Sequence, residues 1–396
     1  MMIAAVVLLL VFMNLFGSEN VSNRVGSLVP QIWGAGSTGQ SLETGPIAIT
    51  LVMIGLESAK EGQHMIKSIF MRTSRDIDLH IICTSDVIPF LQSKLDLVTR
   101  PVHDLSVTFY PITEADIDER SKRAGIGSRH HAGVGGLVKM FLHEVLPVKY
   151  SLYVDTDAVF LSDPALLWAA LVDMVHSDPR KIVAFSHAGD DTEDGLICTC
   201  VMALNLEAMR ATPFMPSTLV PAWDASALGT AATWKAQNVS TDMPTFGDQS
   251  FYWGLWRANR DRFYRLSRSW DISACRNFYR ISLNGVQDIS KSDEASMQTT
   301  TGDLSDAEEG FLFPGIVHFN CQARHVSPFD NLELRANPGW GALLVFAAQY
   351  RWVWLNQYTP GTWLPYGTAA PAMHTKVTSL RFLDERMAAA GFDTRR

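Results

Sequence analysis

Two aspartates separated by one residue, Asp155 and Asp157, follow directly after the apolar run 150–154 (YSLYV). Alternate side chains of an extended backbone project to the same side, so both carboxylates would face one point beyond the strand. Ligands bind at this end of the strands in open α/β sheets, and paired carboxylates suit a hard divalent cation. Such a cation bridges phosphates and neutralises charge on a departing diphosphate. The alternative is that the two acids only cap a helix or form a turn.

A basic residue precedes this strand on a predicted helix. The segment 130–147 (HHAGVGGLVKMFLHEVLP) has a glycine-rich start, which lets backbone approach a ligand, and Pro147 ends it. Lys139 and His143 are four residues apart and are predicted to share its polar face. Because the helix leads into the acid-bearing strand, Lys139 is a candidate to contact a donor phosphate. The alternative is an ordinary solvated lysine.

Two further segments carry side chains with possible chemistry. Asp248 and Gln249 stand at the start of a predicted helix that continues with the aromatic stretch 251–256 (FYWGLW). Helix capping by Asp248 is the alternative to a catalytic role. His318 ends a short apolar strand, and Arg324 follows six residues later. A histidine in that position is either a ligand or a hydrogen-bonded residue of the core.

The elements that must position these residues alternate between strand and helix from Pro46 onward. Apolar runs of strand length occur at the segments IAITLVMIG, DLHIICTSD, SVTFYPI, SLYVDTDAVFL and KIVAFSHA. Helical periodicity separates several of them, as in Met65, Ile66, Ile69 and Phe70, and again in PALLWAALVDM. This alternation predicts an α/β fold with a Rossmann-like, mostly parallel sheet flanked by helices.

In this order the motifs resemble glycosyltransferase family 8, and within it the LARGE-type and glucoside xylosyltransferase branch. The resemblance runs from Ile47 to about Asn356, and it rests on segments that follow the order of the family. They are HHAGVGGLVKMFLHEVLP, YSLYVDTDAVFLSDPALLW, VMALNLEAMR, GDQSFYW and IVHFN.

The resemblance implies a single catalytic domain of the GT-A fold that uses Mn²⁺ and a UDP-sugar and transfers the sugar with retention of configuration. A glycan or glycoprotein would be the acceptor. It also implies a role for each matching residue: Asp155, Asp157 and His318 as metal ligands, Lys139 and Arg324 near the donor diphosphate, and Asp248 and Gln249 beside the transferring sugar. Arg324 stands where the family has lysine, which keeps the charge and changes the geometry.

The chain departs from the family pattern at Cys198-Thr199-Cys200, where the family has Asn, then Ser or Thr, then Gly. An asparagine there reads the donor sugar, and Cys198 lacks the donor and acceptor of an amide. Cys198 is therefore the residue where donor choice is expected to differ. Cys321 likewise replaces a glycine after His318.

Three functions compete on this basis. The first is a metal-dependent transferase that moves a hexosyl or xylosyl group from a UDP-sugar. The second is a lumenal binding protein that keeps the GT-A fold and has lost turnover at Cys198. The third, a sugar nucleotidyltransferase, requires a glycine-rich phosphate loop with a basic partner after the first strand, and 47–62 lacks one. The intact acid pair with His318 favours the first.

Composition and the N-terminal segment indicate the cellular setting. The 396 residues are 47% hydrophobic and carry a net charge of −8, which argues against general nucleic-acid binding. Residues 1–16 are apolar except for Asn14, and they predict a membrane anchor; a cleaved signal and a mis-assigned start codon are the alternatives. The glycosylation triplets at Asn20 and Asn238 agree with a Golgi or other secretory membrane, or with secretion, and chance occurrence of such triplets is the alternative.

The remaining boundaries follow from composition. Residues 17–45 predict a flexible stem, 46–360 the catalytic domain, 287–310 an acidic surface insertion and 361–396 a C-terminal extension. The five cysteines show no paired CxxC spacing of structural zinc. One disulfide, between Cys275 and Cys321, is the predicted pairing, and buried free thiols are the alternative.

Overall fold

The computed structural model of the chain describes the residues 41–124, 126, 133, 135–187, 197–212, 247–273, 280–282, 285–287, 314–319, 327–336 and 338–390. The predicted anchor, both glycosylation triplets, Arg324 and nearly all of the stem and the acidic insertion lie outside them, as do Cys275 and Cys321. Within the described part of the chain, no helix combines the length and the apolar character needed to cross a bilayer.

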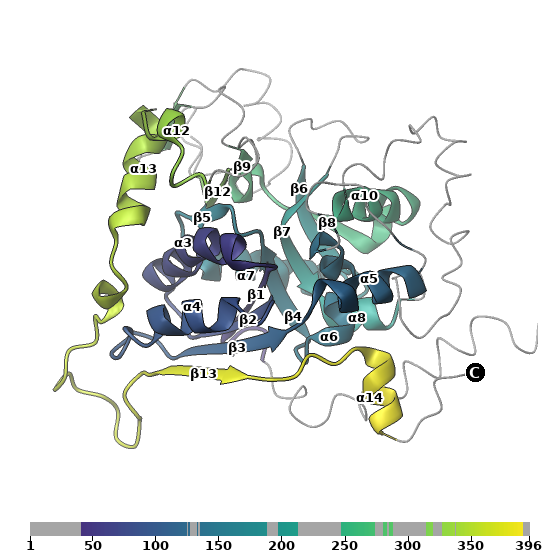
Figure 1. Cartoon of the computed structure of the whole chain (residues 1–396), viewed down its shortest axis with the longest axis horizontal. Helices are drawn as coiled ribbons and strands as arrows, with labels where there is room; N and C mark the ends of the chain where they lie inside the picture. Colours follow the sequence, from purple (N-terminus) through teal and green to yellow (C-terminus); the bar gives the residue numbers. More distant parts are fainter. Residues whose placement is uncertain are drawn as a thin grey trace, which may run out of the picture.

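An eight-stranded sheet forms the centre of the molecule, in the order β13-β3-β2-β1-β4-β7-β6-β8 (Figure 1). The pairs of β4 with β7 and of β7 with β6 are antiparallel, and the other neighbours run parallel. This arrangement confirms the predicted mixed, mostly parallel sheet. The strands are β1 (Ile47–Met53), β2 (Ile77–Cys83), β3 (Leu105–Pro111), β4 (Tyr150–Val154), β6 (Val183–His187), β7 (Ile197–Asn205), β8 (Phe263–Arg265) and β13 (Met373–Val377).

Helices cover both faces of this sheet, and its central strands β1, β4 and β7 are buried on both sides. One core cluster joins β1 to α3 (Leu56–Arg72), α4 (Val87–Leu95) and α7 (Pro164–Ser177). A second joins the other face to α5 (Glu114–Arg123), α8 (Leu206–Arg210) and α10 (Asp248–Ala258). Consecutive residues of β4 alternate between the two, because Leu152 and Val154 belong to the first cluster and Tyr153 to the second.

The predicted strand 151–161 divides at the acid pair. β4 ends at Val154, and β5 (Ala158–Phe160) belongs to a separate three-stranded sheet of order β5-β12-β9. In that sheet β12 (Ile316–His318) is antiparallel to β5 and parallel to β9 (Ile272–Ser273). The residues 155–157 therefore connect the two sheets.

The predicted helix 130–147 is wrong in its form. Its described part is a 3₁₀ helix, η2 (Gly135–Phe141), followed by the single-turn helix α6 (Leu142–Val145). A 3₁₀ helix has three residues per turn, so Lys139 and His143 do not share the face that an α-helix would give them. Both side chains are buried, which also corrects the predicted polar face.

The C-terminal residues complete the central sheet. β13 pairs with β3 along its full length and runs beside it at the edge of the sheet (Figure 1). The following helix α14 (Leu383–Ala389) is held by Arg120, which forms ion pairs with Asp384 and Glu385. Arg120 also lies over the ring of Phe382, 4.7 Å from its centroid. The segment predicted as an extension thus contributes an edge strand and a packed helix.

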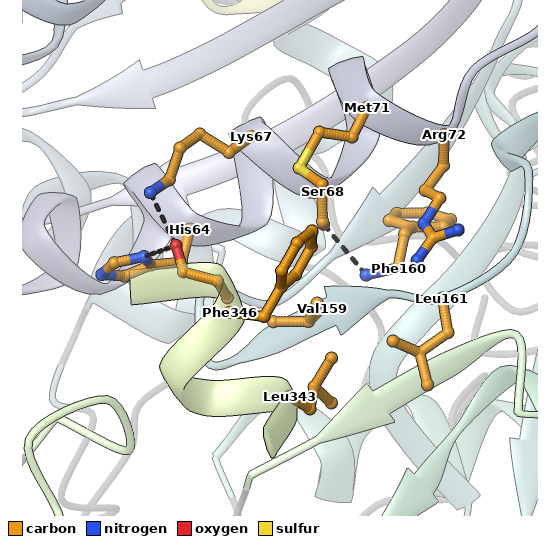
Figure 2. Close-up of a pocket in the computed structure, with 11 residues that line it drawn as sticks. His64, Lys67, Ser68, Met71, Arg72, Val159, Phe160, Leu161, Leu343 and Phe346 are labelled. Atoms are coloured by element: carbon orange, nitrogen blue, oxygen red, sulfur yellow. Dashed lines mark hydrogen bonds between the residues drawn. The ribbon is translucent and has the colours of Figure 1, made fainter. Parts of the chain in front are cut away.

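A small cavity of about 20 Å³ lies between α3, β5 and α13 (Pro338–Gln349), as Figure 2 shows. Lys67 on α3 donates to the carbonyls of Ala347 and Tyr350, at 2.7 and 2.8 Å, at the C-terminal end of α13. His64 stacks on Phe329 with ring centroids 3.7 Å apart. None of the predicted site residues that the structure describes lines this cavity, which lies where α3 packs against α13.

This packing makes a prediction about acid stability. Burial, and secondarily the charge of Lys67, lowers the pKa of His64 to about 3. The unfolded chain therefore binds more protons than the folded one between about pH 6.5 and about pH 3, and stability falls as the pH falls through that window. His64→Phe keeps the stacking on Phe329 and should flatten this dependence in urea unfolding at several pH values. The same substitution at the exposed His176 on α7 is the control and should leave the pH dependence of stability as in the wild type. An unchanged pH profile in His64→Phe would show that His64 does not cause the loss of stability at low pH.

Candidate functional site

Asp155, Asp157 and His318, the three predicted metal ligands, meet where the two sheets join. Their carboxylate oxygens and ring nitrogen all lie within 4.8 Å of one another. The antiparallel register of β12 with β5 sets His318 opposite Ala158, beside the acid pair. Its Nε2 is 3.3 Å from Asp157 Oδ1. The structure thus brings the predicted set together from two distant segments, and their role as ligands remains a prediction.

Backbone hydrogen bonds fix the acid pair between its neighbours. The amide of Asp155 donates to the carbonyl of Cys200 on β7 at 2.8 Å. The carbonyl of Asp157 accepts from the amide of Phe319, also at 2.8 Å. The two carboxylates are therefore held by backbone on both sides, and each side chain keeps 26% of its surface exposed. They are accessible to a small ligand.

A third acid orients His318 from its other side. Asp271 precedes β9, and its Oδ1 lies 3.1 Å from His318 Nδ1. Burial opposes the protonated imidazole, but Asp157 and then Asp271 hold the pKa of His318 well above its ordinary value. With the Nδ1 proton donated to Asp271, Nε2 is the nitrogen left for a cation, which is the usual carboxylate–histidine–metal arrangement. Asp271 could not be predicted from the sequence, because the two-residue strand β9 that follows it is too short to show a period.

Lys139 connects the acid pair to α10. Its Nζ is 2.8 Å from Asp155 Oδ1 and 3.1 Å from Asp248 Oδ2, with only 8% of the side chain exposed. Burial opposes the charge, yet these two carboxylates raise the pKa of Lys139. The hydroxyl of Tyr153 donates to the same Asp155 oxygen at 2.6 Å, and its ring lies under the ammonium at 5.0 Å. Lys139 is thus a buried counter-ion.

Asp248 and Gln249 begin α10 at the same site. Gly247 holds the N-cap position and Asp248 is the first helical residue, so Asp248 is not the cap of this helix. Its Oδ2 instead accepts from the Thr199 hydroxyl at 2.7 Å. Gln249 follows it and is partly exposed. The site predicted from separate motifs therefore includes Lys139, Asp248 and the acid pair in one connected network, while Arg324 lies outside the described residues.

Glu61 on α3 is a further acid of this site that the sequence did not indicate. It accepts from the Thr156 hydroxyl, between the two aspartates, at 2.9 Å. Burial, and then the charge of Asp157, raises the pKa of Glu61 to about 7. On the sequence it is one of several polar residues of an amphipathic helix, so nothing distinguished it from a solvated glutamate.

Cys198 and Cys200 form a disulfide with each other. The sequence did not predict this pairing, and the predicted Cys275–Cys321 bridge lies outside the described residues. A disulfide sulfur carries no proton, so Cys198 in this state offers a donor sugar only a weak acceptor. Cys83 is a buried free thiol, which was the alternative to a disulfide expected for the cysteines of this chain.

Replacing the buried counter-ion tests the network. Lys139→Met leaves the carboxylates of Asp155 and Asp248 without their cation, so the free energy of unfolding should fall by about 3–5 kcal/mol in metal-free buffer. Added Mn²⁺ should restore part of this loss, because a cation again neutralises the acids. Thermal melting with and without Mn²⁺ measures both effects. Lys149→Met, which breaks a more exposed pair with Glu207, should cost at most about 1 kcal/mol, and an equal loss in the two variants would contradict the assignment.

Known proteins with similar sequences are glycosyltransferases. The chain is 29% identical over 123 residues to the xylosyl- and glucuronyltransferase LARGE2s of Gallus gallus. It is 27% identical over 125 residues to LARGE1 of Homo sapiens, and 31% identical over 124 residues to LARGE2s of Danio rerio. Each match covers 31% of this chain and 16% of the relative, so the chain matches less than a fifth of each relative's length. No protein-family model matches the chain.

Solved structures give a weaker likeness. Mouse xyloside xylosyltransferase 1 in its apo form superposes with a TM-score of 0.46 at 17% identity, covering 70% of this chain and 99% of that one. The galactosyltransferase LgtC, in complex with donor and acceptor sugar analogues, gives 0.48 at 12% identity, covering 80% and 99%. These scores define neither fold nor function. The partial sequence matches confirm the resemblance of this chain to the LARGE-type xylosyl- and glucuronyltransferases, over about a third of its length.

Proposed function

We propose that this chain is a metal-dependent glycosyltransferase that takes a xylosyl or hexosyl group from a UDP-sugar and transfers it to a glycan or glycoprotein. The observation that carries the proposal is the convergence of Asp155, Asp157 and His318 at the junction of the two sheets. The named relatives are xylosyl- and glucuronyltransferases, which agrees with this class of reaction.

The charges of the site favour the binding of a cation over the binding of a nucleotide diphosphate by itself. Among the residues that the structure describes, two basic side chains, Lys139 and His318, lie beside four aspartates, namely Asp155, Asp157, Asp248 and Asp271, and beside Glu61, which its raised pKa leaves partly protonated near neutral pH. A diphosphate entering this site alone would meet net negative charge and would be repelled. A hard divalent cation on Asp155 and Asp157 reverses that sign, and carboxylate oxygens are the ligands that Mn²⁺ and Mg²⁺ prefer.

The donor set fits such an ion. Two partly exposed carboxylates and one histidine leave positions open for phosphate oxygens, as a catalytic rather than a closed structural site requires. When bound, the cation would supply Lewis-acid stabilisation of the leaving UDP. His318 must lose its proton for this, and its raised pKa makes cation binding weaker at low pH.

The remaining side chains orient the donor. Thr199 and Lys139 both contact Asp248 Oδ2, which fixes the carboxylate of Asp248 at the start of α10. A carboxylate held by two partners is suited to accept hydrogen bonds from sugar hydroxyls, and Gln249 beside it offers an amide for the same purpose. We assign Asp248 and Gln249 to the transferring sugar on this basis. We assign Lys139, which is close to Asp155, to the donor diphosphate, as the resemblance implies.

The acid pair provides the direct test. Asp157→Asn removes one anionic ligand, while His318 keeps Asp271 as its partner, so the protein should stay folded. Loss of several kcal/mol of charge stabilisation predicts a fall in kcat/KM on the order of 10²–10³. UDP release should be measured with UDP-xylose, UDP-glucose and UDP-galactose, with and without Mn²⁺. Asp173→Asn, on the exposed side of α7, is the control, and full Mn²⁺-dependent turnover in Asp157→Asn would exclude the proposed metal site.

We further propose that residues 1–16 anchor the protein in a Golgi or other secretory membrane, with the catalytic residues lumenal. The apolar start and the polar residues that follow support this topology. The protein should resist carbonate extraction from membranes, and its catalytic part should be protected from added protease until detergent is supplied. A protein that is released by carbonate and digested without detergent would rule the topology out.

A further inference from the structure

A second group of ligand-type side chains lies beside the acid pair. Cys198, Cys200, Asp271 and His318 each offer one ligand atom, and these four atoms lie within 4.8 Å of one another. His318 belongs to both groups, with Nε2 toward Asp157 and Nδ1 toward Asp271. The second group differs from the first in its ligand atoms, because two of the four are cysteine sulfurs.

An irregularity in β7 brings the two cysteines together. The pairing of β6 with β7 passes from Phe185–Met202 directly to Ser186–Cys198, so the intervening residues of β7 bulge out of register. Within the bulge the Cα atoms of Cys198 and Cys200 are 5.5 Å apart. Thr199 between them is directed to Asp248. Bulges of this kind redirect side chains beside functional sites.

All four side chains are enclosed. Cys198, Cys200 and His318 are buried, and the side chain of Asp271 is 4% exposed. Asp271 is itself held in place, because the Ser186 hydroxyl donates to its Oδ2 at 3.2 Å and leaves Oδ1 toward His318. A ligand that is hydrogen-bonded from a second shell in this way is already oriented for coordination.

The disulfide has little structural purpose. It closes a loop with one intervening residue, and cross-links stabilise chiefly by restricting long loops of the unfolded chain. Its reduction by a dithiol transfers two electrons and two protons to the sulfurs and oxidises the dithiol to its own disulfide. Two thiols then stand beside an imidazole and a carboxylate. Both thiols lose their protons to solvent when a metal binds, and the ring nitrogen of His318 that coordinates the metal must be unprotonated as well.

We propose that the reduced chain binds one zinc ion through Cys198, Cys200, Asp271 and His318, and that the disulfide abolishes this site. Two thiolates with one imidazole and one carboxylate suit Zn²⁺ in four-coordinate geometry and are poor ligands for Mn²⁺. In an oxidising lumen the disulfide state excludes zinc, and a reducing compartment creates the site. The inference does not rest on the proposed transferase activity, because it concerns metal binding alone.

Cobalt provides the decisive measurement, since Co²⁺ replaces Zn²⁺ and reports thiolate ligands by a charge-transfer band in the near ultraviolet. The full-length protein is reduced under anaerobic conditions, freed of reductant and titrated with Co²⁺, and Zn²⁺ then displaces the Co²⁺. The reduced protein should show the band with one equivalent of Co²⁺, and the oxidised protein should not. This comparison requires no substitution and is therefore independent of any folding defect.

Variants locate the ligands. Cys198→Ser/Cys200→Ser should lose the band and weaken Zn²⁺ binding by more than about 100-fold, beyond the loss expected from an outer-shell partner. Cys83→Ser, which removes the buried free thiol of β2, should leave both measurements unchanged. Asp157→Asn should lose Mn²⁺-dependent UDP release and keep the band, so failure of this inference and failure of the transferase proposal are distinguishable.

Two results would overturn the inference. One is a reduced wild-type protein whose Co²⁺ complex has no thiolate band. The other is a band or a Zn²⁺ affinity that survives in Cys198→Ser/Cys200→Ser and disappears instead in Cys275→Ser/Cys321→Ser. Circular dichroism melting of each variant shows whether it is folded, and a double variant that melts cooperatively and still binds Zn²⁺ as tightly as wild type counts against the site.

Discussion

Crowding of carboxylates at the end of β4 is the constraint on which the rest of the site depends. Asp155 and Asp157 are adjacent in space, and Asp248, Asp271 and Glu61 approach them from α10, the start of β9 and α3. Like charges at such distances repel strongly once they are removed from water. Two buried basic side chains reduce this repulsion. Lys139 lies between Asp155 and Asp248, and His318 lies between Asp157 and Asp271. Each cation is shared by two acids, so within the described part of the chain the acids outnumber the cations, which is the basis of the proposed binding of a further cation.

The two sheets make this crowding possible. A strand that ended at Val154 and turned back to solvent would leave its acids hydrated and unconstrained. Here the chain passes from the central sheet into the three-stranded sheet within 155–157, and β12 brings His318 against that connection. The bond from the Asp155 amide to the Cys200 carbonyl ties the same connection to β7. The positions of the three predicted ligands are therefore set by backbone pairing in the two sheets on either side of them.

Much of this arrangement was predictable from the sequence because it depends on long, periodic elements. The strand 150–154, the acids that end it and the helix 164–177 follow from apolar periodicity and from the abrupt change to acidic residues. The position of His318 followed from the resemblance. The form of 135–145 was not predictable, because buried residues on all sides allow a 3₁₀ helix to replace an α-helix without any change in the apolar pattern. The periodicity of a single sequence does not report contacts between distant segments. It therefore could not predict the roles of Asp271 and Glu61, nor the bond between Cys198 and Cys200.

His318 belongs both to the group with the oxygen ligands of Asp155 and Asp157 and to the group with the sulfur atoms of Cys198 and Cys200. The departure from the family pattern at Cys198 therefore concerns the acid pair as well as the donor sugar. An asparagine in place of Cys198 would lack the sulfur that lies beside Asp271 and His318. A cysteine pair next to Asp271 also acts on the histidine that faces the acid pair, because both groups use the same imidazole ring. The Cys200 carbonyl supports the Asp155 amide, so a change in the bulge of β7 also reaches the other end of the acid pair. If the proposed sites are occupied as we infer, the oxidation state of the two cysteines would be coupled to the acid pair through the shared imidazole of His318.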